Sequence, residues 1–474
     1  MALYGMAFTM TKRVRSSKKQ VRCRVTPARK LAFEVLEEIR LRHGYLEQAW
    51  KLHAKRVSLP PSEKAFARLL ATEVVSRKGS LDLLINRVLT SPDDINDDVR
   101  NALRISFAEL FYLRKPAHVV THEGVELVRS FAPKAAGVAN FALRRACEQR
   151  DLFPFGDIQS DCGAASLYFG FPEWLACTLK EQFGWPCALR FMEQSNYSAP
   201  LFFIVNQARA NGPQTLKALV NQGVKIAPVS RIQQQTYGLS CFVFASRSDV
   251  GHEFVHDLLR KGSLVVSDGA AQIVASKAVP DSYPERFLEI GAGRGTKSIL
   301  LQNVALARFG KQLVLDTLDV DQRRTKERIA RLKQADIFQR EAFCQDGCDL
   351  SRFEDETYDA IFIDAPCTGV GTLRRHSDIR WRVTPKDSAS MAQTGLSMLT
   401  QAARLVKPGG RLTYATCTLF HQENEIVIQE FLKTEQGSLF RVAYQKLIDD
   451  LLQEDQTAPL FDTHFVCVLQ KAVS

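Results

Sequence analysis

Residues Leu288–Ser298 have the sequence LEIGAGRGTKS, and this stretch indicates the fold class more clearly than any other part of the chain. It follows an apolar run and leads into residues with helical spacing. Glycine adopts the left-handed backbone conformations of tight turns and lets a ligand come close to the main chain. A glycine loop between a strand and a helix is typical of nucleotide-type binding sites, although a purely structural turn can use the same glycines.

Strands and helices alternate around this loop over residues 262–474, which predicts an α/β fold with an open, mostly parallel sheet and helices on both faces. The expected strands are Phe287–Ile290, Val314–Leu318, Tyr358–Ile363 and Arg411–Ala415. The expected helices lie near Thr296–Ala307, Gln322–Lys333 and Ala389–Leu405, and a turn is expected at Lys407–Gly410. Ligands of such sheets bind at the carboxyl ends of the strands.

The first part of the chain has a different pattern. From residue 27 to 150, apolar residues recur at helical spacing in stripes, which predicts an all-helical bundle. The stripes are Leu31, Val35, Leu36 and Ile39; Phe66, Leu69, Leu70 and Val74; and Leu103, Phe107, Leu110 and Phe111.

Between the bundle and the α/β region, residues 151–165 are expected to form a linker. Residues 166–261 then mix a helix near Pro172–Phe183 with strands such as Leu201–Asn206 and Cys241–Ala245. This mixture predicts a small α+β domain.

The chain has 474 residues and a net charge of +11, much of which comes from its first 30 residues. They hold nine Lys and Arg side chains and no acidic one, which predicts a disordered basic arm over residues 1–26. Such an arm suits phosphate contacts with a polyanion, although a solvated tail without a partner is the alternative.

Composition excludes several classes of protein. Hydrophobic residues make up 45% of the chain, and no run approaches the 18 or so apolar residues of a membrane-spanning helix. The 11 cysteines are scattered, odd in number and free of Cys-x-x-Cys pairs, which argues against a disulfide scaffold and a zinc site. We therefore expect a soluble, cytoplasmic protein with no membrane contact and no metal ion.

Two aspartates extend the candidate ligand site beyond the glycine loop. Asp319 ends the next expected strand and is placed to take a ribose hydroxyl, and Asp346 would lie near an adenine. The loop also comes close to the phosphate-binding pattern G-x-x-x-x-G-K-[ST] of ATPases, with Ile361–Asp364 as the magnesium-binding strand. Thr296 stands where that pattern needs its second glycine, so an ATPase is disfavoured.

Two cysteines follow the tips of expected parallel strands. Asp364-Ala365-Pro366-Cys367 leaves one tip, and Tyr414-Ala415-Thr416-Cys417 leaves another. Strand tips share one edge of a parallel sheet, so both cysteines and Asp364 are expected beside the glycine loop. A cysteine there can be a nucleophile if its thiolate is stabilised, and on these grounds either one qualifies. Two inert core thiols are the alternative.

These motifs resemble the RNA cytosine-5 methyltransferases of the NOL1/NOP2/Sun family, which use S-adenosylmethionine. The residues that carry the resemblance are Asp364–Cys367, the basic run Arg374–Trp381, Tyr414–Cys417 and the pair Glu423-Asn424. The whole chain is similar to the bacterial members that act on 16S ribosomal RNA, and residues 27–150 are similar to their NusB-like RNA-binding module. The resemblance implies a Rossmann-like class I methyltransferase domain over residues 262–474, and a cytoplasmic monomer whose partner is small-subunit ribosomal RNA.

The resemblance also implies roles for individual residues. Cys417 would attack carbon 6 of the cytosine, Cys367 would help release the product, and Asp364 would hydrogen-bond the N3/N4 edge. Lys297 would lie near the base and the cofactor. The implied cofactor-binding residues are Glu289, Gly291, Ala292, Gly293, Arg294, Gly295, Lys297, Asp319, Asp346 and Asp364. The implied RNA-phosphate contacts are Arg374, Arg375, His376 and Arg380.

The chain departs from the family pattern in its glycine loop, which usually runs close to Asp-x-Cys-Ala-Ala-Pro-Gly-Gly-Lys-Thr. Here Glu289 replaces the Asp and Gly291 the Cys, while Lys297 is retained, so we expect S-adenosylmethionine binding to survive. The strand around Phe465–Leu469 lacks the family's usual aromatic-rich ending. Two alternatives remain open: the same chemistry on transfer RNA, or a non-catalytic RNA-binding assembly factor.

Overall fold

The computed structural model describes residues 25–230, 236, 240–453 and 459–473. The predicted basic arm lies almost wholly outside these residues. The chain divides into two compact units, which are described separately. The first contains residues up to Val74 together with Asp82–Asp151, and the second contains Val75–Leu81 and Leu152–Ser474.

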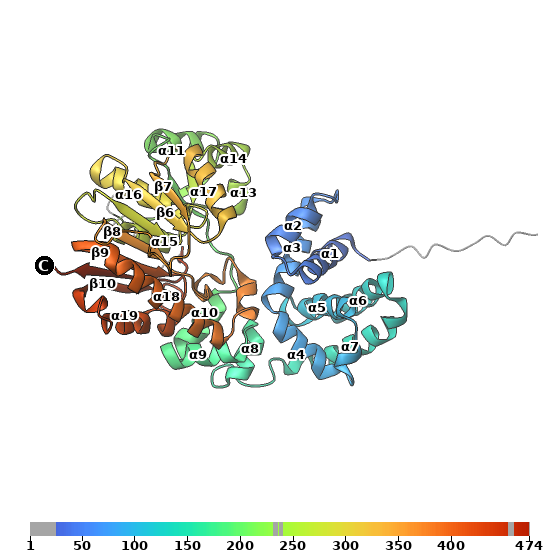
Figure 1. Ribbon diagram of the computed structural model, residues 1–474. Coiled ribbons are helices and arrows are strands. Elements are labelled where there is room, and N and C mark those ends of the chain that lie inside the picture. Colours follow the sequence, from blue (N-terminus) through green and yellow to red (C-terminus); the bar gives the residue numbers. More distant parts are fainter. Residues whose placement is uncertain (1–24, 231–235, 237–239, 454–458, 474) are drawn as a thin grey trace, which may run out of the picture. The chain divides into compact units, whose positions relative to one another are not determined.

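All regular elements in the described residues of the first unit are helices (Figure 1). The helices of this part of the chain are α1 (Pro27–Arg42), α2 (Leu46–Ala54), α3 (Pro61–Ser76), α4 (Lys78–Val88), α5 (Asp97–Phe107), α6 (Ala117–Phe131) and α7 (Ala136–Gln149). A buried ion pair crosses its core, because the Arg29 guanidinium donates to both Glu109 carboxylate oxygens at 2.9 and 2.6 Å. Such a bidentate pair satisfies the charge of both buried groups.

The predicted burial of one apolar residue in this unit, Leu69, is wrong. Leu69 is 42% exposed, whereas Ala67, Leu70 and Val74 of the same helix are buried. The buried positions repeat at intervals of three and four residues, so they form one face of α3 and Leu69 falls outside it.

The second unit begins with short helices and an antiparallel sheet. The helices are α8 (Cys162–Phe169), α9 (Glu173–Phe183) and α10 (Trp185–Gln194), and α8 begins inside the stretch expected to be a linker. The sheet has the strand order β2-β3-β1-β4 in the described residues. Its strands and helices are β1 (Phe202–Val205), α11 (Gly212–Asn221), β2 (Ile226–Pro228), β3 (Cys241–Phe244), α13 (Arg247–Val250), α14 (Glu253–Arg260) and β4 (Leu264–Val266). Since β4 completes this sheet, the sheet extends past residue 261.

The larger sheet has the order β10-β11-β9-β8-β5-β6-β7 in the described part of the chain. Strands β9, β8, β5, β6 and β7 are parallel, as predicted, and β10 and β11 add an antiparallel edge. Its elements are α15 (Gly269–Ala278), β5 (Phe287–Ile290), α16 (Thr296–Phe309), β6 (Leu315–Asp319), α17 (Gln322–Gln334), β7 (Glu341–Cys344), β8 (Tyr358–Asp364), α18 (Pro385–Leu405), β9 (Val406–Thr416), α19 (Glu425–Leu432), β10 (Phe440–Ile448) and β11 (His464–Lys471). The predicted turn Lys407–Gly410 lies inside β9 as an irregularity of its pairing with β8. Tyr358 pairs with Val406 and Ala360 with Arg411, so the residues between Val406 and Arg411 interrupt the regular register.

Helices cover both faces of this sheet (Figure 1). Ile299, Leu300 and Val304 of α16 pack in one hydrophobic core with α15 and with residues of the smaller sheet. Helices α18 and α19 pack on the opposite face. Each strand therefore has an α16 face and an α18 face.

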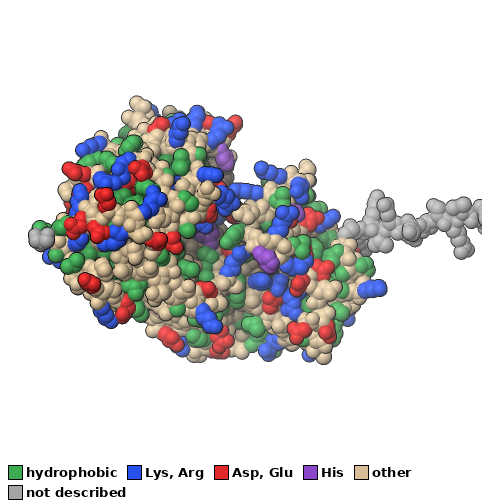
Figure 2. Space-filling model, viewed as in Figure 1, with side chains coloured by type: hydrophobic (Ala, Val, Ile, Leu, Met, Phe, Trp, Pro, Cys, Tyr) green, Lys and Arg blue, Asp and Glu red, His purple; other side chains and the backbone are tan. Residues whose placement is uncertain are grey.

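Charged side chains of both signs lie on the visible face of both units (Figure 2). On the face shown in Figure 2, Lys and Arg side chains are interspersed with Asp and Glu side chains. No helix in the described part of the chain combines the length and apolar character needed to cross a bilayer.

Candidate active site

The glycine loop connects β5 to α16 and has left-handed backbone at Gly291, with φ of 81°, and at Gly293, with φ of 52°. A β-carbon on Gly291 would lie 2.3 Å from the Asp364 carbonyl oxygen, so only glycine lets this loop pass the tip of β8. A β-carbon on Gly293 would meet no atom closer than 3.9 Å. The loop thus leaves open space above Gly293, as a ligand-binding loop requires.

Two buried carboxylates support the loop from below. Asp319, at the end of β6, accepts hydrogen bonds from the backbone N–H groups of Gly293 at 2.8 Å and Asp321 at 2.9 Å. Glu289 is fully buried, and its Oε2 accepts from the Ser298 hydroxyl at 2.5 Å. Burial raises the pKa of Glu289 to about 7, against the effect of the Ser298 hydrogen bond. Its Oε1 has no partner among the described residues, which leaves one acceptor free for a group brought by a ligand.

The other expected cofactor residues lie around this loop. Ala292 is buried, and Gly295 gives α16 its left-handed N-cap. The exposed Arg294 side chain pairs with Glu327 of α17 at 2.8 Å, so at most its backbone lines the loop. Asp346 is exposed after β7, where its Oδ1 accepts from the Cys348 N–H at 2.9 Å.

Lys297 and Asp364 form an ion pair at the edge of the sheet. Lys297 lies in the first turn of α16 and Asp364 ends β8, and the Lys297 Nζ is 2.7 Å from both carboxylate oxygens. Burial by itself would lower the pKa of Lys297, but the negative charges of Asp364 and Cys417 outweigh it, so the pKa is raised. Lys297 therefore remains a cation beside the two cysteines.

Cys367 and Cys417 meet, as the strand-tip argument predicts. Their Sγ atoms are 3.1 Å apart, and the Cys417 N–H donates to the Cys367 Sγ at 3.2 Å. The hydrogen bond from Cys367 lowers the pKa of Cys417, and the charge of Lys297 acts in the same direction against burial. The pKa of Cys367 is raised well above the ordinary thiol value, first by that hydrogen bond and then by burial. Cys417 is therefore the better nucleophile of the two.

A buried polar cluster fixes both cysteine loops. Glu423 accepts hydrogen bonds from the Thr368 N–H and hydroxyl, both at 2.8 Å, and from the Ser388 hydroxyl at 2.9 Å. Asn424 accepts from the Thr416 hydroxyl at 2.6 Å and donates to the Thr418 carbonyl at 3.1 Å.

Glu423 therefore holds the Cys367 loop, and Asn424 holds the Cys417 loop. Thr368 follows Cys367, while Thr416 and Thr418 flank Cys417. The sequence marks Glu423-Asn424 only as part of a motif, and the structure adds their positioning role.

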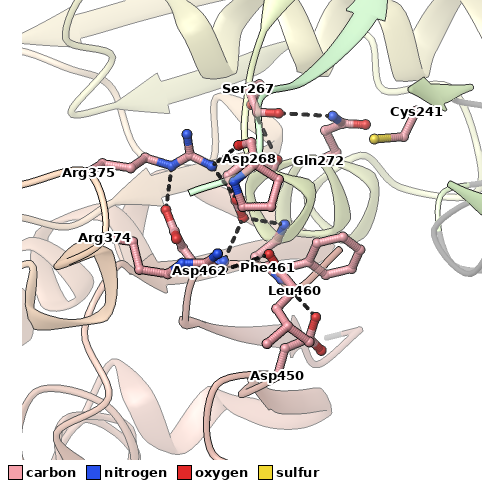
Figure 3. A network of polar contacts seen from close by, with 12 residues as sticks. Cys241, Ser267, Asp268, Gln272, Arg374, Arg375, Asp450, Leu460, Phe461 and Asp462 are labelled. Carbon is pink, nitrogen blue, oxygen red and sulfur yellow. Dashed lines mark hydrogen bonds and ion pairs between the residues drawn. The ribbon is translucent and has the colours of Figure 1, made fainter. Parts of the chain in front are cut away.

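The basic run after Cys367 is a correction to the sequence-based prediction. Figure 3 shows the Arg375 guanidinium between Asp268 and Asp462, with distances of 2.8 and 2.6 Å. Arg374 donates to the carbonyls of Leu460 and Ser198, each at 3.1 Å. Burial and the charge of Asp462 raise the pKa of Asp268 to about 7, although Arg375 opposes this. Both arginines therefore hold distant chain segments together.

Arg380 is a second correction, because it is fully buried. It donates to the Gly170 carbonyl at 3.1 Å and to Asn196 Oδ1 at 2.9 Å, and its guanidinium lies 4.1 Å from the centre of the Phe171 ring. Of the four predicted phosphate contacts, His376 is the exposed one.

Known proteins share both parts of this chain. Residues 280–460 match the family model described as 16S rRNA methyltransferase RsmB/F, and residues 26–148 match the NusB family. The probable ribosomal RNA small subunit methyltransferase B of Bacillus subtilis (strain 168) is 26% identical over 86% of this chain and 88% of its own. The ribosomal RNA small subunit methyltransferase B of Xanthomonas campestris pv. campestris is 29% identical over 79% of this chain and 80% of its own length.

Solved structures share the fold as well. The crystal structure of PH0851 has a TM-score of 0.70 at 20% identity and covers 94% of this chain and 99% of its own. The comparisons confirm the resemblance and the fold class predicted from the sequence.

Proposed function

Since the chain is an RNA methyltransferase that joins a NusB-family domain to an RsmB/F-type domain, we propose that it methylates carbon 5 of a cytosine in 16S ribosomal RNA, with S-adenosylmethionine as methyl donor. The observation that carries the proposal is the pair of cysteines, 3.1 Å apart, beside the Lys297–Asp364 ion pair. A methyltransferase acting on an amine or a hydroxyl group has no need of two thiols at that place.

Carbon 5 of cytosine is too weak a nucleophile to attack a methyl sulfonium directly. The Cys417 thiolate forms a bond to carbon 6, and the electrons of the 5,6 double bond become available at carbon 5. Carbon 5 then forms a bond to the methyl group, and the bond between methyl and sulfonium breaks with its electrons on sulfur. A water molecule accepts the carbon 5 proton, the electrons of that carbon–hydrogen bond restore the 5,6 double bond, and the bond between carbon 6 and sulfur breaks so that Cys417 leaves as a thiolate.

Cys367 and the ion pair assist this sequence. With its raised pKa, Cys367 stays protonated while Cys417 attacks, and it helps release the product by hydrogen-bonding the departing Cys417 sulfur. Asp364 hydrogen-bonds the N3/N4 edge of the base and favours a protonated ring in the covalent adduct. Lys297 fixes Asp364 and stabilises the Cys417 thiolate.

The glycine loop fits S-adenosylmethionine, which supplies an electrophilic methyl group when bound. Space above Gly293 admits a ligand, and Asp319 keeps further acceptor capacity for ribose hydroxyls beyond its two backbone hydrogen bonds. The unpaired Glu289 Oε1 is available to a polar group, directly or through water. Asp346, which follows β7, would bind the adenine.

The target base must leave its stack, or come from a single-stranded loop, to reach the half-buried Cys417. We test the proposal by mixing the purified chain with unmodified small-subunit ribosomal RNA and S-adenosylmethionine, then digesting the RNA to nucleosides for mass spectrometry. We expect 5-methylcytidine. Its absence, while S-adenosylmethionine still binds and a transfer RNA pool is methylated, would refute the ribosomal substrate. A methylated nucleoside other than 5-methylcytidine would refute the chemistry.

A further inference from the structure

His464 is the first residue of β11, and the register of the sheet brings it to the end of β9 that Cys417 follows. β11 pairs antiparallel with β9 as far as Phe465 opposite Thr416, and His464 and Cys417 are the next residues of the two segments. Gly371 links the two segments, because its N–H donates to the Cys417 carbonyl and its own carbonyl accepts from the residue before His464, each at 3.0 Å.

Both side chains lie on the α16 face of the sheet. Side chains alternate between the two faces of a strand. Val466 and Ala415, which are paired in the register and lie two positions from His464 and Cys417, belong to the core shared with α16. His464 and Cys417 therefore lie on that same face, where Lys297 occupies the first turn of α16.

The charge of Lys297 gives independent support for this placement. Burial lowers the pKa of His464 to about 3, and the positive charges of Lys297 and Arg375 contribute in the same direction, against the effect of the Asp462 carbonyl. The imidazole is therefore neutral at neutral pH. A neutral imidazole carries one donor and one acceptor.

His464 has a buried polar atom that the chain itself does not satisfy. The residue is 5% exposed, and within the described residues its Nδ1 has no hydrogen-bond partner. The same holds for Asp462 Oδ1 and Thr463 Oγ1, the two positions before it. Buried polar atoms are nearly always paired with protein, water or ligand. Adjacent unpaired atoms at the edge of the reaction centre indicate a segment whose partner comes from outside the chain.

We propose that His464 is a substrate-binding residue, whose neutral imidazole hydrogen-bonds the target cytosine while Cys417 is bonded to carbon 6. This inference rests on the proposed function and adds to it a contact with the base. Because the single N–H of the neutral ring donates to the Asp462 carbonyl, the other ring nitrogen is an acceptor, and it can pair with an N–H of the base edge. A neutral ring adds no second positive charge next to Lys297, so it leaves the Lys297–Asp364 pair undisturbed.

The test compares His464→Phe, which keeps a ring without polar atoms, with His464→Asn, which keeps a polar atom near the position of Nδ1. His256→Phe, on the exposed surface of α14, is the matched control. We expect His464→Phe to raise KM for RNA and lower affinity for it about tenfold, the effect of one lost hydrogen bond with a buried partner. His464→Asn and the control stay within about threefold of the wild type, and S-adenosylmethionine affinity measured by calorimetry does not change.

A second substrate separates base contact from structural support. Once the methylated cytosine is mapped, RNA with an abasic site at that position should bind the wild type and His464→Phe equally. Persistence of the tenfold difference on abasic RNA would overturn the inference, as would equal losses in the Phe and Asn variants accompanied by weaker S-adenosylmethionine binding. A wild-type chain that makes no 5-methylcytidine would refute the proposed function and this contact together. Wild-type activity with an unaffected His464→Phe would refute the contact alone.

Discussion

Replacing Glu423 by Ala is expected to loosen the Cys367 loop, because this one carboxylate accepts three of the hydrogen bonds that position it. The substitution leaves the buried Thr368 N–H without an acceptor, which costs about 1–3 kcal/mol. The Ser388 hydroxyl also loses its partner, while the Thr368 hydroxyl keeps Thr418 at 2.9 Å. The combined loss is about 3 kcal/mol, which lowers the melting temperature of a unit of this size by about 4 °C.

Glu423→Gln is the matched control. Its amide oxygen can accept from the Thr368 N–H while its NH₂ donates to the two hydroxyl oxygens, so the cluster stays satisfied. Burial raises the pKa of Glu423, so the folded chain holds this proton more tightly than the unfolded chain does. The stability of the wild type relative to Glu423→Gln should therefore fall as pH rises above the ordinary range of a glutamate.

The assay combines thermal unfolding with the rate of RNA methylation. We expect the melting temperature of Glu423→Ala to be about 4 °C lower than that of the wild type. Its methylation rate should be about 100-fold lower, since small displacements of reacting groups have effects of this order. The melting temperature of Glu423→Gln should remain within about 1 °C of the wild-type value, and its methylation rate should differ only a few-fold. The positioning role is refuted if Glu423→Ala keeps the wild-type melting temperature and methylation rate. It is also refuted if both values fall as far in Glu423→Gln as in Glu423→Ala.

Three further substitutions test other parts of the site. Lys297→Met removes the cation that lowers the pKa of Cys417, so the rate of Cys417 alkylation by iodoacetamide should rise with pH over a higher range than in the wild type; an unshifted profile would show that Lys297 does not stabilise the thiolate. Gly291→Ala places a β-carbon 2.3 Å from the Asp364 carbonyl, so S-adenosylmethionine binding measured by calorimetry should be lost, and wild-type affinity would contradict the close approach. Arg380→Ala removes the donor to the buried Gly170 carbonyl and to the half-buried Asn196 side chain, so the melting temperature should fall. The slope of log RNA affinity against log salt concentration should stay constant, and a slope smaller by about one would place Arg380 on a phosphate instead.

The sequence was sufficient to predict that the central residues of the candidate site converge at one edge of the sheet. Gly291, Asp364, Cys367 and Cys417 all follow strands of one parallel sheet, and the tips of such strands share an edge. Alternating apolar runs were enough to locate those strands. Convergence of the two cysteines then followed from topology, without knowledge of any side-chain contact.

The partners of long side chains could not be predicted in this way. Arg375 and Arg380 look like phosphate contacts because they lie in a basic run, but their acceptors are carboxylates and carbonyls from distant parts of the chain. Burial of a guanidinium depends on those acceptors, which no local pattern reveals. No motif marks His464 either, because it lies at the start of β11, an antiparallel strand between β10 and β9 whose neighbours the local sequence does not reveal.

The central claim is that Cys417 attacks the base and Cys367 assists its release. The most direct measurement incubates Cys417→Ala and Cys367→Ala with RNA and S-adenosylmethionine and looks for covalent protein–RNA adducts by denaturing electrophoresis. The account predicts that Cys367→Ala accumulates an adduct, because the Cys417 bond forms and is not resolved, and that Cys417→Ala forms none and is inactive. An adduct in Cys417→Ala and none in Cys367→Ala would reverse the two roles and contradict the account.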